Sequence, residues 1–380
     1  MSGSLDRLLR KEVVQRFGAM PRLDLKPPPA EPSVATQGRI PQLDGLRAVA
    51  ILSVFLNHTL RVPLTWVGVD IFFVLSGFLI TGILLKRKTS GDGYFKYFYR
   101  RRVFRILPPY LLTIVVFGLV FTWRVFHPWP LFAFFAMNLQ RSFGFTGTWA
   151  PLPLWSLAVE EQFYLLWPII ILLVSEKMLF RIAIAAVLIT PFLRFFCTPL
   201  FPTHYSIYML MPFRADLLCA GAALSIAWEH RTAKLESFYR TRAWLGCIAG
   251  FGGLAFVQIW PVFRLVSNTR IGNGLDYSLS VLGSFSLLAW ALSDRGWLRR
   301  LLASPPMRFV GQISYTMYLS HMMAILLVER YTSSVVVMTL VALVMTIAYS
   351  SLSWFLMERP LISLGARGVQ RKTRATATAG

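Results

Sequence analysis

Charged residues and cysteines are scarce in this sequence. Only 15% of the 380 residues are charged and 56% are hydrophobic, whereas soluble domains carry about 25% charged residues. This deficit excludes an ordinary water-soluble protein and indicates a lipid environment. The three cysteines, Cys197, Cys219 and Cys247, lie in apolar segments without the spacing of metal ligands. They therefore imply neither a disulfide framework nor a zinc site.

Acidic residues are also rare, so the net charge is strongly positive. The sequence has 17 Asp and Glu against 39 Lys and Arg, which gives a formal net charge of +22. Nucleic-acid binding would require a basic face on a soluble domain or a nucleic-acid motif, and we find neither. The excess is instead typical of a membrane protein that keeps its positive residues in cytoplasmic loops. We therefore predict no nucleic-acid partner.

Long apolar runs take the place of the missing charge. Blocks such as Leu111 to Phe121 and Val335 to Met345 extend, with their flanks, to the ~20 residues that a membrane helix needs. Their apolar residues are continuous rather than spaced along one helix face. We predict an all-α polytopic membrane protein with ten transmembrane helices. The predicted spans are 43–61, 67–85, 104–123, 154–174, 179–197, 212–228, 243–262, 276–293, 308–328 and 333–356.

Lys and Arg are concentrated in every second loop between these spans. The cluster Arg100, Arg101 and Arg102 follows the second span, and Arg299 with Arg300 follows the eighth, while the alternate loops hold only scattered arginines. Basic loops stay on the cytoplasmic side of a membrane. We therefore predict that both the N-terminus and the C-terminus are cytoplasmic.

Two regions are not predicted to span the membrane. Trp129 to Asn138 is too short, since ten residues of helix rise only ~15 Å, and we expect an interfacial or re-entrant piece, followed by an interfacial loop at Gly144 to Pro153. In the N-terminal region, Leu5 to Phe17 is an alternative candidate for an amphipathic helix on anionic lipid. The predicted division is a disordered basic cytoplasmic tail (1–40), a transmembrane domain (41–360) and a second basic cytoplasmic tail (361–380).

Ionisable residues inside the predicted spans mark the candidate site, because a charge at the bilayer centre costs at least ~2.5–3.5 kcal/mol. The first span carries Arg47 and His58, which are 11 residues apart. At ~100° per residue both lie on one helix face, ~16 Å apart along the axis. An imidazole is well suited to take a proton near neutral pH. The alternatives are a snorkelling Arg47 and a purely structural His58.

Further charges lie near the ends of the third and fourth spans. Arg102 and Arg105 share a helix face at i, i+3, and guanidinium groups there suit the phosphates of coenzyme A or of a lipid headgroup. Glu160 and Glu161 enter the fourth span from the outer side and point ~100° apart. We expect one to pair with an arginine, while the other faces a cavity to hold a sugar hydroxyl or to orient the base.

The second and sixth spans hold the remaining acids of interest. Arg214 and Asp216 open the sixth span, where an ion pair that pins the helix is favoured over a role in binding. Asp70 lies near the outer end of the second span. It is a candidate to orient either His58 or Arg214.

Polar side chains also follow one stripe of the ninth span. Ser314, Tyr318 and His321 recur at i, i+4 and i+7, so their hydroxyl and imidazole groups face one direction. Membrane helices use such residues to bind each other. Support by His321 is therefore favoured over catalysis.

Taken in order, these motifs resemble the acyltransferase-3 family, bacterial inner-membrane O-acyltransferases that modify surface and exported carbohydrates. The resemblance extends from about residue 40 to Pro360, and six motifs occur in the right order. They are Leu43-Asp44-Gly45-Leu46-Arg47 with His58; Gly68-Val69-Asp70 through Ser76-Gly77-Phe78; Arg102 with Arg105; Trp155-Ser156 with Glu160 through Tyr164; Arg214 with Asp216; and Ser314-Tyr315 with Tyr318 and His321.

The resemblance implies a ten-helix domain in the cytoplasmic (inner) membrane that uses cytoplasmic acyl-CoA, commonly acetyl-CoA, as donor. The acceptor would be a hydroxyl of a carbohydrate at the outer face, in a glycan, lipopolysaccharide, exopolysaccharide or glycolipid. Arg47 and His58 match the family's arginine and histidine, and Arg102 with Arg105 match its paired arginines near the donor. Some relatives carry an added esterase-like domain, which we expect to be absent here.

The predicted site has three parts and no metal or permanently bound cofactor. His58 would deprotonate the acceptor hydroxyl for direct attack, or would take the acyl group itself. The predicted residues are His58, Glu161 and Asp70 for catalysis; Arg47, Arg102 and Arg105 for the acyl-CoA donor; and Glu160, Arg214, Asp216, Tyr318 and His321 for the acceptor.

Two alternatives come from other classes of membrane protein. One is a proton-coupled transporter or flippase for a lipid-linked glycan or an acyl carrier, with His58 and the acids as a proton relay. The sequence shows no inverted repeat and no matched pair of broken spans, which are the usual signs of transport. The other is a structural membrane subunit of a polysaccharide assembly complex, which the number of charges inside the spans disfavours.

Overall fold

The computed structural model describes residues 40–89, 93–143, 153–261 and 267–365. All regular secondary structure in these residues is helical, so the all-α prediction is confirmed. The predicted tail 1–40 with its alternative helix at Leu5 to Phe17 lies outside the described residues, apart from Ile40. So do most of the predicted loop at Gly144 to Pro153 and most of the tail 361–380.

Every predicted span falls on helical residues. Six helices in the described part of the chain are long and apolar enough to cross a membrane, which agrees with a multi-pass membrane protein. With their bounds, they are α3 (Gly68–Lys88), α4 (Tyr94–Val120), α7 (Leu154–Leu173), α8 (Glu176–Cys197), α13 (Arg270–Ser293) and α16 (Val335–Ser353).

The other four predicted spans fall on helices that are shorter or more polar, so the count of ten and the orientation stay predictions. The seventh span is interrupted by a π-helical turn at Ile248–Gly252. These helices are α2 (Pro41–Thr59), α10 (Ala215–Glu229), α11 (Ala233–Cys247) with α12 (Gly253–Val257), and α15 (Pro305–Glu329).

Some helices extend beyond the apolar run that predicted them. α4 begins at Tyr94, ten residues before the predicted start of its span at 104. The apolar run marks only the part of a helix that lies in hydrocarbon. The basic and aromatic residues before position 104 belong to the same helix as the apolar run. Arg102 and Arg105 therefore lie one turn apart on α4.

The stretch from Trp129 to Asn138 forms short helices. α5 (Trp129–Ala133) and the start of α6 (Met137–Ser142) are separated by Phe135, which has a positive φ of 50°. The side-chain amides of Asn138 and Gln162 exchange hydrogen bonds of 3.2 and 3.0 Å. These bonds attach α6 to α7.

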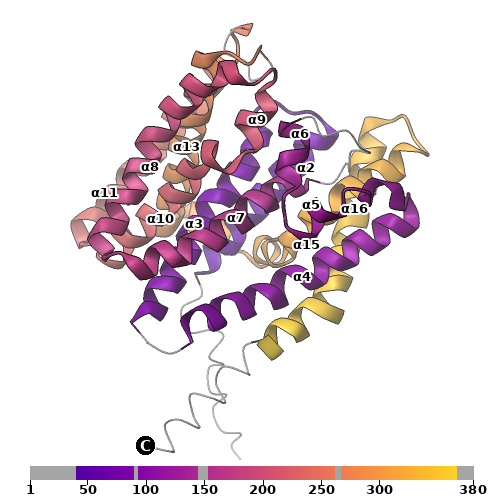
Figure 1. Ribbon diagram of the computed structural model, residues 1–380, viewed down its shortest axis with the longest axis horizontal. Coiled ribbons are helices and arrows are strands. Elements are labelled where there is room, and N and C mark those ends of the chain that lie inside the picture. The colour runs from indigo at the N-terminus through magenta and orange to yellow at the C-terminus, as the bar shows by residue number, and fades with distance from the viewer. Residues whose placement is uncertain (1–39, 90–92, 144–152, 262–266, 366–380) are drawn as a thin grey trace, which may run out of the picture. The chain divides into compact units, whose positions relative to one another are not determined.

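The most extensive helix contact joins α3 to α10, which lie side by side (Figure 1). Gly77 of α3 lies against the backbone of Leu218, and Gly221 of α10 lies against the backbone of Val74. A Cβ atom at either glycine would overlap a carbonyl oxygen. Small residues therefore let these two helices approach closely, as is typical of membrane proteins.

A second extensive contact joins α2 to α15. Near their N-terminal ends, Gly311 lies against the backbone of Asp44. Toward their C-terminal ends, the side chain of His321 reaches His58. The two helices therefore run in the same direction, and their contact places the two histidines together.

Candidate active site

A pocket opens between α2, α3, α4, α7 and α15. Three arginines, Arg47, Arg102 and Arg105, line it together with one carboxylate, Glu160, so its lining side chains carry a net charge of +2. The remaining wall is apolar or bears hydroxyl groups, and it includes Val69, Phe72, Leu157, Ser156 and Tyr318. The pocket thus combines a cationic part with an apolar, hydroxyl-bearing part.

The three arginines are oriented by different neighbours. Arg47 lies 3.8 Å from Asp44, one turn earlier in α2. The guanidinium of Arg102 lies 4.4 Å from the ring centroid of Tyr164, a distance typical of a cation–π contact. Arg105 interacts electrostatically with Glu358. The guanidinium groups that line the pocket are thus only loosely paired with acids.

Glu358 was missed by the sequence analysis. It lies in a π-helical turn, Trp354–Glu358, that follows α16, and such turns are frequent at functional sites. Its buried carboxylate accepts hydrogen bonds from Thr316 (2.7 Å) and Ser353 (2.9 Å). The sequence feature that could have identified Glu358 is its place as an acid directly after the apolar run of the last predicted span.

The two adjacent glutamates of α7 have different surroundings. Glu160 lines the pocket and accepts a 2.6 Å hydrogen bond from Ser76, which in turn accepts one of 3.0 Å from Tyr164. Glu161 lies outside the pocket lining, and its buried Oε1 has no hydrogen-bond partner among the described residues. The pair therefore points in two directions, with Glu160 facing the cavity.

Tyr318 contacts both the pocket and one of the histidines. Its hydroxyl lies 2.5 Å from Ser156 Oγ, and its ring packs edge-on against Phe72 at 6.0 Å between centroids. The centroid of the same ring lies 5.7 Å from that of the His321 ring. One residue thus contacts both the pocket wall and the imidazole of α15.

His58 and His321 form a direct contact. Nε2 of His321 lies 3.3 Å from Nδ1 of His58, and the ring centroids are 5.1 Å apart. His321 is fully buried, whereas His58, next to the last residue of α2, is exposed. His321 was predicted to bind the acceptor, and its contact with His58 was not predicted.

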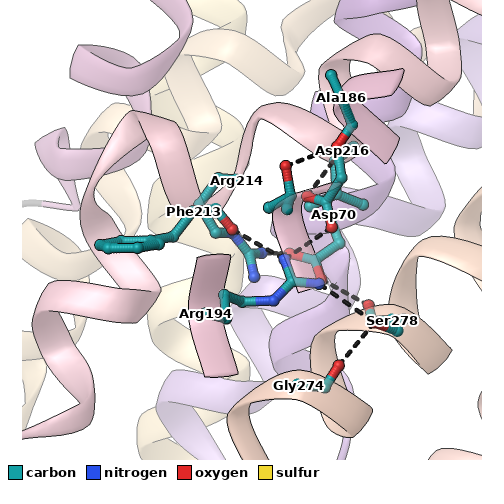
Figure 2. Close-up of polar contacts among 11 residues, drawn as sticks. Asp70, Ala186, Arg194, Phe213, Arg214, Asp216, Gly274 and Ser278 are labelled. Atoms are coloured by element: carbon teal, nitrogen blue, oxygen red, sulfur yellow. Dashed lines mark hydrogen bonds and ion pairs between the residues drawn. The ribbon is translucent and has the colours of Figure 1, made fainter. Parts of the chain in front are cut away.

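A separate cluster of buried charges ties α3, α8, α10 and α13 together (Figure 2). Arg214 pairs with Asp70, and Arg194 pairs with Asp216 at 2.7 Å. Ser280 donates a 2.5 Å hydrogen bond to Asp70. The four charged side chains are between 0% and 1% exposed. None of them lines the pocket described above.

The cluster corrects the expected pairing within the sixth span. Arg214 and Asp216 were expected to form the ion pair that pins the helix, but each takes its partner from another helix, α3 or α8. Residues two positions apart on a helix point in different directions, so a direct pair is disfavoured. Arg194 was missed, although an arginine far from the basic cytoplasmic end of the predicted span 179–197 was a usable signal.

The two acids predicted to orient His58 do not touch it. Both carboxylate oxygens of Asp70 are taken, one by Arg214 and the other by Ser280. Among the described residues, the contacts of the His58 ring are with the carbonyl of Val54 and with His321. Neither Asp70 nor Glu161 is therefore in a position to act on His58 directly.

Comparisons with known proteins agree on one family. The acyltransferase-3 family model, described as an acyltransferase domain, matches residues 40–356. A protein of Staphylococcus aureus named putative O-acetyltransferase is 29% identical over 87% of this chain and 58% of its own length. The peptidoglycan O-acetyltransferase OatA of Listeria monocytogenes is 30% identical over 74% of this chain and 49% of its own.

The chain therefore spans between about half and three fifths of the length of these curated relatives. A protein of Bacillus subtilis named putative peptidoglycan O-acetyltransferase shows the same pattern, with 29% identity over 88% of this chain and 56% of its own length. No solved structure matches the chain.

Proposed function

This chain belongs to the acyltransferase-3 family, and we propose that it is a membrane O-acetyltransferase. In this proposal it takes the acetyl group of cytoplasmic acetyl-CoA and attaches it to a hydroxyl of a carbohydrate outside the cytoplasmic membrane. The observation that carries the proposal is the pocket: three arginines line it together with Tyr318, and the ring of Tyr318 also contacts His321, which contacts His58.

The cationic part of the pocket suits the phosphates of coenzyme A. Arginine presents a planar fork of donors that matches phosphate oxygens, and Arg47, Arg102 and Arg105 converge on one cavity. The thioester would extend past Phe72 and Tyr318 toward the histidines. Arg47 lies 11 residues before His58 on α2, which is ~16 Å along the helix axis.

His58 supplies the proton transfer in this proposal. As the acceptor oxygen attacks the thioester carbon, the hydroxyl proton moves to the imidazole, and the new O–C bond forms. The C–S bond then breaks, and the leaving thiolate of coenzyme A takes the proton from the imidazolium. The exposed position of His58 leaves room for a glycan acceptor.

Several features support the proposed acceptor and location. OatA and the protein of Bacillus subtilis are named for acetylation of peptidoglycan, so a cell-wall or other surface glycan is the proposed acceptor class here. With basic loops in the cytoplasm, His58 would lie at the outer end of its span. The common direction of α2 and α15 agrees with their being odd-numbered spans, the first and the ninth.

The direct test is transfer of acetyl label by the purified full chain. The protein in liposomes is incubated with acetyl-labelled acetyl-CoA and soluble peptidoglycan fragments, with other glycans in parallel, and labelled glycan is measured. We expect label on the glycan with the wild type and none with His58→Gln. The matched control is His230→Gln, because His230 is exposed and pairs with Glu176 at 2.5 Å.

Equal transfer by the wild type and His58→Gln would contradict the role of His58. Movement of an unmodified glycan or acyl carrier across the liposome membrane, without acetyl transfer, would overturn the proposed activity in favour of a transporter.

A further inference from the structure

The contact between the two histidines bears, together with a backbone carbonyl of α2, on which nitrogen of His58 is available for chemistry. We propose that His321 is a positioning residue that keeps His58 in the tautomer with its proton on Nδ1, so that Nε2 is the reactive nitrogen. This inference rests on the proposed function for its chemical meaning. Its structural content is independent of the identity of the substrates.

The tautomer of His321 follows from its backbone partner. Nδ1 of His321 lies 2.8 Å from the carbonyl oxygen of Tyr318. A carbonyl oxygen only accepts hydrogen bonds, so Nδ1 must carry a proton. A neutral imidazole has one N–H, and burial without a carboxylate partner disfavours the charged ring. Nε2 of His321 is therefore an acceptor.

The tautomer of His58 follows in turn from that of His321. Nδ1 of His58 lies 3.3 Å from Nε2 of His321 and 3.0 Å from the carbonyl oxygen of Val54. Both of these atoms are acceptors, so Nδ1 of His58 must be the donor. The lone pair of the neutral ring is then on Nε2. No described residue forms a hydrogen bond with that nitrogen, and the side chain is exposed.

This arrangement provides what a catalytic base needs. When Nε2 takes the proton of the acceptor hydroxyl, the ring becomes an imidazolium whose Nδ1–H already faces two acceptors. Hydrogen bonds to a charged donor are stronger than neutral ones, so the pair stabilises the charge that develops. An acid commonly fills this place next to a catalytic histidine. Here the Val54 carbonyl and His321 fill it.

Tyr318 links this pair to the pocket. Its backbone oxygen holds His321, while its hydroxyl reaches Ser156 in the pocket wall. Gly311 brings α15 close enough to α2 for the contact, because its position faces the backbone of Asp44. Two acceptors thus favour the Nδ1–H tautomer of His58, the Val54 carbonyl of its own helix and Nε2 of His321 from a second helix.

The tautomer can be observed directly. In the full chain with ¹⁵N-labelled histidine, solid-state NMR distinguishes Nδ1–H from Nε2–H, and His58→Gln identifies the signals of His58 among the five histidines. We expect His58 as Nδ1–H in the wild type and a mixture of tautomers in His321→Leu. An Nε2–H tautomer in the wild type, or an unchanged tautomer in His321→Leu, would overturn the proposal.

Kinetics provides the second readout. His321→Leu should lower kcat by ~10- to 100-fold, the effect of losing a hydrogen bond to a charged group, with KM for acetyl-CoA unchanged. His321→Gln places a carbonyl oxygen near the position of Nε2, so it should recover most of this loss. Ser320→Ala is the matched control, because Ser320 is buried beside His321 but bonds to the backbone of Thr316.

Wild-type turnover in His321→Leu would overturn the role of His321, and so would a loss in His321→Gln as large as that in His321→Leu. These results differ from a failure of the proposed function. In that case the wild type itself transfers no acetyl group, while the NMR experiment still reports the tautomer of His58.

Discussion

Two groups of charged residues lie among the helices of this protein, and they are held in opposite ways. In the cluster of Arg194, Arg214, Asp70 and Asp216, each guanidinium contacts a carboxylate, and both arginines are 0% exposed. In the pocket, the side chain of Arg47 is 24% exposed, and its nearest acid, Asp44, is 3.8 Å away. Closely paired charges stabilise helix packing, whereas loosely paired charges around a cavity remain available to a ligand.

α3 contacts both regions and turns a different face to each. Val69, Phe72, Phe73 and Ser76 of α3 line the pocket, at the i, i+3, i+4, i+7 spacing of one helix face. Asp70 lies on the face toward Arg214 and Ser280. The same helix therefore contributes residues both to the ion-pair cluster and to the wall of the pocket.

The largest effect is expected on stability, from removal of one carboxylate of the ion-pair cluster. Asp70→Ala leaves Arg214 buried without its carboxylate, and removal of one partner of a buried pair costs about 3–5 kcal/mol. We expect poor accumulation in the membrane and a strongly lowered Tm in detergent. The double variant Asp70→Leu with Arg214→Met should recover much of the stability. A single variant as stable as the wild type would show that the cluster does not hold the helices together.

The second largest effect is expected on the rate of acetyl transfer, with the stability of the protein unchanged. His58→Gln should reduce acetyl transfer by roughly 10²- to 10⁴-fold, the usual contribution of a general base, while Tm stays near that of the wild type. His58 is exposed at the end of α2, so little packing is lost. The measurement is turnover of labelled acetyl-CoA beside a thermal unfolding curve. A drop in Tm as large as that of Asp70→Ala would remove the contrast between the two regions.

A smaller effect is expected at the cationic side of the pocket. Arg105→Ala should raise KM for acetyl-CoA by about tenfold or more, as for loss of a charge-assisted hydrogen bond, with kcat nearly unchanged. Acetyl-pantetheine, which lacks the nucleotide phosphates, should be used equally well by the variant and the wild type. Arg101→Ala is the control, since Arg101 is exposed and bonds to Tyr97 at 2.5 Å. An equal loss with both donors would argue against phosphate binding by Arg105.

The smallest effect is expected at Tyr318, which contacts both the pocket and His321. Tyr318→Phe removes the hydroxyl that contacts Ser156 but keeps the ring and the backbone carbonyl that holds His321. Loss of one neutral hydrogen bond costs about 0.5–1.5 kcal/mol, so we expect a few-fold change in kcat or Tm. The combination with Ser156→Ala should add little. A clear further loss in the double variant would mean that Ser156 acts independently of Tyr318.

Helix positions and the faces within one helix could be predicted from the sequence. Apolar runs located the helices, six of which are long and apolar enough to cross a membrane in the described residues, and the 11-residue spacing placed Arg47 and His58 on one face of α2. The same arithmetic separated Glu160 from Glu161. These predictions depend only on hydrophobicity and on the geometry of a single helix. Both are local properties that do not depend on which other helices pack against it.

Contacts between helices could at best be reduced to alternatives in this way: Asp70 was a candidate to orient either His58 or Arg214, and the structure pairs it with Arg214. The partners of Asp70, Asp216 and His58 are Arg214, Arg194 and His321, which lie 144, 22 and 263 residues away in sequence. A single helix determines which of its side chains share a face, but not which helix that face meets. That choice was decided by close packing at glycines such as Gly77 and Gly311, and it converted two isolated histidines into a pair.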